Sequence, residues 1–156
     1  MKAAVNQVNN GWEARIRLNS RINDLTFKKK NGSFAKGMDL NSNLELKYDP
    51  DAKNIHITSD NFSLDKNKFT LDANFGIKGN SKFNIKFYHP AIAFKEASAI
   101  VSNNIKSKLE KFDLKKPIEV TCTISGDLKV KGTTKIHVVA PVKNNELTAV
   151  DQVFTN

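Results

Sequence analysis

The residues of this chain that could do chemistry are three histidines, a single cysteine and 16 carboxylates. His56, His89 and His137 fall in three separate segments, and none has a cysteine or carboxylate partner at the spacing of a metal site. Cys122 lies on the apolar phase of its segment, so we interpret it as a small buried hydrophobic residue. With one cysteine, no intramolecular disulfide bond can form. The sequence therefore predicts no metal site and no cofactor.

Motifs of the common catalytic and phosphate-binding sites are missing from the sequence. It contains no Gly-x-Ser-x-Gly elbow, no glycine-rich phosphate loop and no His-Glu-x-x-His pair. The segment 49–54 has two aspartates around a proline, but a calcium loop needs about six oxygen ligands at defined spacing, which this segment does not supply. We therefore predict no catalytic residues and no enzymatic activity.

Five stretches of the chain instead carry an apolar side chain at every second residue. In the first of them, Trp12, Ala14 and Ile16 alternate with Glu13 and Arg15. A period of two with one apolar and one polar face is typical of half-buried antiparallel strands. The five stretches are residues 12–18, 40–48, 69–77, 83–87 and 118–124. They predict a sheet with one apolar face.

Turn residues join these stretches into a meander. Short segments rich in Asn, Asp and Gly are typical of tight turns between antiparallel strands. They occur at 31–32, 49–54, 65–68 and 79–80. Between the second and the third turn we expect two separate short strands, one at 55–57 and one at 62–64.

The alternation stops at His89-Pro90 and gives way to a helical period. Apolar residues then recur at spacings of three and four, which places them on one face of an amphipathic helix over about 94–112. Glu96 near its start and Lys106 near its end complement the helix dipole. The predicted packing face of this helix consists of Phe94, Ala97, Val101, Ile105, Leu109 and Phe112. We expect it to lie across the apolar face of the sheet.

Length and composition indicate one folded domain, residues 1–156. The hydrophobic fraction of 39% with only 4 prolines and 7 glycines excludes a disordered or collagen-like chain. The net charge of +9, spread along the chain, favours anionic partners such as nucleic acid, acidic polysaccharide or phospholipid head groups. No apolar run is long enough to span a bilayer, and residues 1–10 lack the apolar core of a signal peptide. We expect the chain to be a piece of a longer protein.

Aromatic and basic residues fall on opposite phases of the predicted strands. A sheet that binds nucleic acid usually places both kinds on one exposed face, so we do not expect nucleic acid as a partner. The apolar phase of the central strands is a candidate surface for lipid. Its members are Phe62, Leu64, Phe69, Leu71, Phe75, Ile77, Phe83, Ile85 and Phe87. From the residues alone, this face could form a groove open to acyl chains or be closed by a second sheet in a sandwich that serves interaction or adhesion.

Phe-Asn-Ile at 83–85, the predicted helix and LKKPIEVTCTISG at 114–126 follow one another along the chain, and a Leu-x-x-Pro-Ile unit leads into a strand that ends in glycine. Through these segments, most of the chain resembles the C-terminal region of AsmA-like proteins. The segments 25–34 (LTF and NGSF at its two ends) and 69–75 (FTLDANF) are similar to the upstream hairpins of that family. Gly-Thr-Thr at 132–134 departs from the tighter Asp-Pro turn expected there.

The resemblance implies a fold and a role. AsmA-like proteins are large envelope proteins of Gram-negative bacteria, anchored in the inner membrane by an N-terminal helix and extended into the periplasm. The apolar concave side of their curved antiparallel sheet can carry lipid acyl chains, and they are linked to phospholipid transport and outer-membrane assembly. This chain is far shorter and lacks the anchor, so it would be a periplasmic piece of such a protein.

These observations lead to one prediction. The fold class is mainly β, an antiparallel meander forming a curved groove-like sheet or half-sandwich, with one amphipathic helix. The function is a non-enzymatic, lipid-contacting groove segment of an AsmA-like envelope protein. Its partners are phospholipid or acyl chains, an anionic membrane surface and neighbouring segments of the same full-length protein. The alternative is a closed β-sandwich that binds other proteins and has no lipid ligand.

Overall fold

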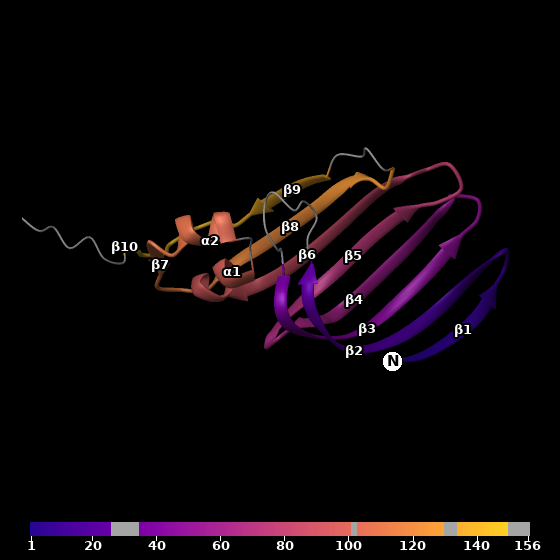
Figure 1. The fold of residues 1–156 in the computed structure, drawn as a ribbon, viewed down its shortest axis with the longest axis horizontal. Helices are drawn as coiled ribbons and strands as arrows, with labels where there is room; N and C mark the ends of the chain where they lie inside the picture. The colour runs from indigo at the N-terminus through magenta and orange to yellow at the C-terminus, as the bar shows by residue number, and fades with distance from the viewer. Residues whose placement is uncertain (26–34, 101–102, 130–133, 150–156) are drawn as a thin grey trace, which may run out of the picture.

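The structure is a computed structural model that describes residues 1–25, 35–100, 103–129 and 134–149. Its elements, in chain order, are β1 (Lys2–Val8), β2 (Gly11–Leu25), β3 (Ala35–Asp49), β4 (Asn54–Leu64), β5 (Asn67–Gly76), β6 (Lys82–Ile92), α1 (Phe94–Ile100), α2 (Asn103–Leu109), β7 (Phe112–Leu114), β8 (Ile118–Asp127), β9 (Thr134–Val139) and β10 (Leu147–Ala149). Eight strands form one open antiparallel sheet in the order β1-β2-β3-β4-β5-β6-β8-β9 (Figure 1). The predicted fold class, a mainly β antiparallel meander, is confirmed.

Cross-strand pairing keeps the apolar residues of all eight strands in phase. One row of paired residues consists of Val5, Ala14, Leu46, Ile57, Ala73, Ile85, Ile124 and Ile136. The next row, one residue along each strand, consists of Ala4, Arg15, Glu45, Thr58, Asp72, Lys86, Thr123 and His137. Because successive side chains of a strand point to opposite faces, the first row lies on an apolar face and the second on a polar face.

β4 is one continuous strand, so the expectation of two separate strands at 55–57 and 62–64 was wrong. The apolar residues of β4 change phase between Ile57 and Phe62, and this change suggested a break. A register shift between Ser59 and Phe62 absorbs it. A β-bulge adds one residue to a strand, so side chains beyond it return to the face they would otherwise leave.

β1 and the small β7–β10 sheet were not predicted. β1 pairs with β2 through a two-residue loop, in which Asn9 has a φ of 50°. Asparagine tolerates this left-handed conformation better than most residues do. The turns expected at 49–54, 65–68 and 79–80 are present, whereas the Asn-Gly turn at 31–32 lies outside the described residues.

Two short helices replace the single helix predicted over 94–112. Phe112, predicted on its packing face, instead begins β7, where it pairs with Ala149 of β10. This ladder engages the backbone of residue 112, which therefore cannot continue a helix. Val101 lies outside the described residues, and Ile105 lies in α2 but its side chain is not described. Leu109, at the end of α2, is half-buried.

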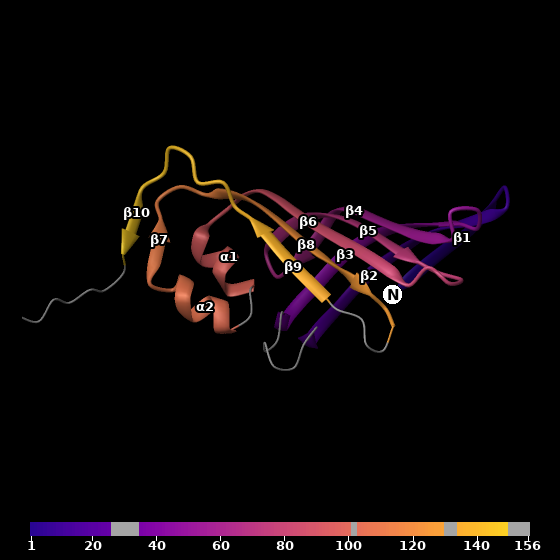
Figure 2. The ribbon, with the colours of Figure 1, turned by 90° about the horizontal axis from the view of Figure 1, so that it is seen from above.

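The helices cover the apolar face at one end of the sheet only (Figure 2). The core at this end consists of Leu64, Phe69, Ile92, Leu114 and Ile118. Phe94, Ala97 and Ile100 of α1 pack against it from one side, as predicted for the first two of them. The curved ends of β2 and β3 also contribute to it, through Ile22, Met38 and Leu40. The groove therefore has a closed end.

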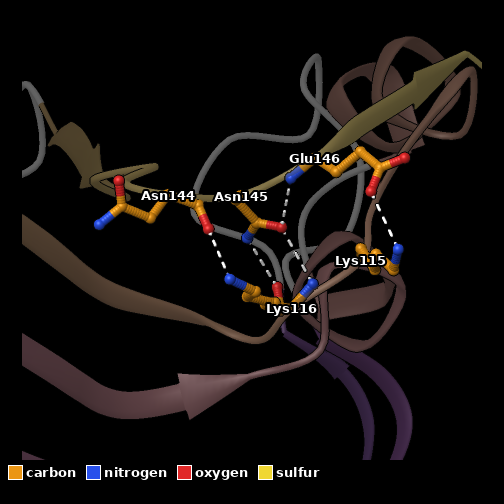
Figure 3. A network of polar contacts seen from close by, with 5 residues as sticks. All are labelled: Lys115, Lys116, Asn144, Asn145 and Glu146. Carbon is orange, nitrogen blue, oxygen red and sulfur yellow. Dashed lines mark hydrogen bonds and ion pairs between the residues drawn. The ribbon is translucent and has the colours of Figure 1, made fainter.

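A polar network fixes the segment before β10 to the corner between β7 and β8 (Figure 3). The backbone N–H of Lys116 donates to Oδ1 of Asn145 at 2.9 Å, and Nδ2 of Asn145 donates to the carbonyl oxygen of Lys116 at 2.8 Å. Nζ of Lys116 donates to the carbonyl oxygen of Asn144 at 2.8 Å, and Lys115 forms an ion pair with Glu146 at 3.0 Å. These contacts hold β10 against β7, beside the helices.

The row of paired residues offers a matched test of the core. Ile124 and Ile136 are cross-strand partners, but Ile124 is 0% exposed and Ile136 is 45% exposed. We expect Ile124→Ala to lower the free energy of unfolding by about 2–5 kcal/mol, because it opens a cavity in packed surroundings. Ile136→Ala should change it by about 0.5 kcal/mol or less, as a surface substitution does. Chemical denaturation measures both, and equal losses would contradict this description of the core.

Candidate functional site

The nine residues predicted to contact lipid lie together along the apolar face of β4, β5 and β6. Leu64, Phe69, Leu71 and Phe83 are buried, and Phe62, Phe75, Ile77, Ile85 and Phe87 are half-buried. Cross-strand pairs join them, such as Phe75 with Phe83 and Leu71 with Phe87. Ile77 lies just beyond the end of β5, where its backbone N–H donates to the carbonyl oxygen of Lys53 at 2.8 Å. The structure thus brings these residues onto one surface.

Aromatic side chains on this face contact one another in pairs. The ring centroids of Phe62 and Phe87 are 5.3 Å apart. Those of Phe75 and Phe83 are 6.2 Å apart and nearly parallel. Such pairs contribute about 0.5–1.5 kcal/mol beyond the burial of their area. The rings are therefore held in place by the sheet itself.

At the closed end, a cavity of about 60 Å³ lies between α1 and the sheet. Its lining includes Leu64 and Phe69 from the hairpin of β4 and β5, Ile92 from the end of β6, Ala97 and Ile100 from α1, and Cys122 from β8. No buried side-chain nitrogen or oxygen in the described residues lacks a hydrogen-bond partner. The cavity therefore suits a ligand part that has no polar atoms.

At the opposite end, the apolar face has no cover from the described helices. Its last row includes the half-buried Trp12, Tyr48, Ile55 and Phe75. A hollow of about 590 Å³ opens on the same face over β1, β2 and β3 and is lined in part by Trp12, Ala14 and Leu46. This hollow is wide and open, so a ligand in it would remain exposed to solvent on one side.

Two titratable groups near the closed end are shifted toward their neutral forms. Burial raises the pKa of the Cys122 thiol to about 11. Burial also lowers the pKa of His89, an effect that the negative charge of Glu96 partly opposes. The ring of His89 packs edge-on against Phe69, with centroids 5.1 Å apart. At neutral pH this end of the groove therefore carries no charge from either group.

The polar face of the sheet holds exposed ion pairs. Arg15 pairs with Glu45 at 3.3 Å, and Lys47 pairs with Glu13 at 3.0 Å. Exposed pairs of this kind contribute between about 0 and 1 kcal/mol, so they serve solvation more than stability. Within the described ranges, no group of three His, Cys, Asp or Glu side chains could hold a metal ion.

No helix in the described part of the chain is long and apolar enough to cross a membrane.

Comparison with family models, curated proteins and solved structures finds no match to this chain. The function of the candidate site is therefore inferred from the geometry and chemistry of its own residues.

Cys122 provides a direct measure of burial in the cavity. With its pKa raised from 9.0 to about 11, its thiolate fraction near pH 8 falls roughly 100-fold. We expect iodoacetamide to alkylate the folded protein about 100-fold more slowly than the protein in denaturant. Because folding favours the neutral thiol, its contribution to stability is present below pH 9 and is lost as the pH rises through about 11. Equal alkylation rates in folded and denatured protein would place the thiol in solvent.

Proposed function

We propose that this chain is a non-enzymatic, lipid-contacting groove segment of an AsmA-like envelope protein. The observation that carries the proposal is the apolar face that runs in phase across eight strands of an open sheet. Among the described residues, helices cover this face at one end only. An apolar surface of this extent on a soluble protein usually marks a binding site. A hydrocarbon chain can fill it without leaving a polar group unpaired.

The same observation argues against the closed-sandwich alternative. A β-sandwich buries the inner faces of two sheets against each other. In the described residues the second sheet has only β7 and β10, and these strands lie beside the helices (Figure 2). No sheet in this part of the chain covers the row that includes Trp12, Tyr48 and Phe75. A ligand could contact that row without displacing any described strand.

We place the segment in the periplasm, within a full-length protein anchored in the inner membrane. The sequence resemblance to AsmA-like proteins supports this location. Neighbouring segments of the same protein could extend the sheet at β1 or β9, which are its two edges in the described structure. The net charge of +9 supports contact with anionic phospholipid.

A titration with a fluorescent fatty acid tests lipid binding. We expect saturable binding, because the apolar face offers a limited surface. Phe75 is half-buried and stacks on Phe83. Phe75→Ser should weaken binding by about tenfold or more while costing less than the roughly 3 kcal/mol typical of truncating a buried Phe. The loss of binding would then exceed the loss of stability.

The matched control is Asn84→Ser, one residue from Phe83 but exposed on the polar face. It should leave both binding and stability unchanged. If the wild-type protein binds no fatty acid and Phe75→Ser costs about 3 kcal/mol or more, the face is a closed core and the proposal fails.

A further inference from the structure

The groove is asymmetric, and this asymmetry specifies how a lipid would lie in it. Resting on the proposed lipid-contacting function, we infer that the cavity beside α1 receives the methyl end of one phospholipid acyl chain. The head group then lies at the opposite end of β5, beside the turns that follow β3 and β5. The ligand class is an anionic phospholipid with an unbranched acyl chain, bound in one orientation.

The cavity is suited to the end of a chain and not to a whole ligand. Its volume of about 60 Å³ is well below the roughly 300–1,000 Å³ of sites that enclose a complete small molecule. Its lining is apolar apart from the Cys122 thiol, which burial keeps neutral at physiological pH. A charged or hydrogen-bonding group placed there would lose its solvation without a partner. A terminal methyl group and the methylenes next to it need none.

The apolar face is long enough to hold one extended acyl chain. Phe69 lines the cavity, and Phe75 lies in the last row at the open end of the same strand. Six residue steps of about 3.3 Å separate them, which gives about 20 Å. An acyl chain spans about 15 Å in one leaflet, half of the roughly 30 Å hydrocarbon core of a bilayer. A chain whose tip lies in the cavity would therefore end about 5 Å before Phe75, and the glycerol and head group attached to it would extend toward the turns beyond.

Lysines lie near both ends of this path. Beside α1, Lys66 pairs with Glu96, and Lys95 of α1 pairs with Asp113. Lys68 at the start of β5 and Lys108 of α2 form no ion pair with any described residue. Near the opposite end, Nζ of Lys78 lies 5.6 Å from the centre of the Tyr48 ring.

Lys53 lies close to Lys78 because the carbonyl oxygen of Lys53 accepts the hydrogen bond from Ile77, the residue before Lys78. Neither of these two lysines forms an ion pair with any residue in the described structure. An anionic head group would meet these two lysines there, together with the exposed Asp49 and Asp51 of the turn after β3. The orientation therefore follows from the apolar lining of the cavity and not from a difference in charge between the two ends.

Photo-crosslinking of the wild-type chain tests the orientation. The probes are two palmitoyl lysophosphatidylglycerols, one with a diazirine at the methyl end of the chain and one with a diazirine next to the carbonyl. We expect the first to label peptides that contain Ala97, Ile100 or Cys122, and the second to label peptides from the turns that contain Lys53 or Lys78. Free palmitic acid as a competitor shows whether the chain alone displaces the probes. Reversed labelling, or the same labelling by both probes, would overturn the inference even though lipid binds.

A variant of the cavity provides an independent readout. Ala97 lines the cavity, whereas Ala99 of the same helix is exposed. In the wild type, each methylene added to a saturated fatty acid should tighten binding about fourfold while it is still buried. Ala97→Phe fills the cavity, so this rise should stop at a shorter chain, and Ala99→Phe should behave as the wild type.

The outcomes separate the two proposals. If the wild type binds no lipid, the proposed function fails and the inference fails with it. If the wild type binds lipid but Ala97→Phe and Ala99→Phe show the same dependence on chain length, the groove binds lipid without using the cavity, and only the inference is overturned. We also expect Cys122 of the wild type to be alkylated more slowly when the protein is saturated with lipid than when it is lipid-free. An unchanged rate would count against the inference. This readout does not depend on whether Ala97→Phe folds.

Discussion

The fold depends on one alternation being kept in phase over eight strands. Ala14, Leu46 and Ile57 pair across β2, β3 and β4, and their row continues to β9. A slip of one residue in any strand would move its apolar side chains to the polar face. Where the sequence changes phase, the sheet changes register. The bulge in β4 restores the phase, and a second shift in β6 accommodates Pro90, which cannot donate a ladder hydrogen bond.

This alternation produces a surface that the described part of the chain covers incompletely. At one end, α1 and the curved ends of β2 and β3 close over a core that includes Leu64 and Ile92. At the other end, Tyr48 and Phe75 remain half-buried. The cavity at the closed end has an apolar lining, and the turns at the open end carry Lys53 and Lys78. A molecule with a hydrocarbon tail and an anionic head matches this polarity, which connects the arrangement of the strands to the proposed lipid contact.

The sequence predicted most of the sheet, because alternation and turn residues are local signals. It did not predict β1, whose residues are all exposed and whose pattern of Ala3, Val5 and Gln7 carries little contrast. It extended the helix too far because Phe112 continues the helical spacing, although pairing with β10 takes that residue into β7. Alternation also shows that one face avoids water without showing what covers it. The choice between an open groove and a closed sandwich therefore required the three-dimensional arrangement.

Native mass spectrometry of the gently purified chain tests the central claim most directly, because it detects any molecule that the apolar face retains. The account predicts a population of protein with added masses equal to those of phospholipids or fatty acids. These adducts should disappear after extraction with organic solvent and return when lipid is added to the refolded protein. A chain that carries no adduct, takes up none on addition of lipid and remains monomeric would contradict the claim that this face holds acyl chains.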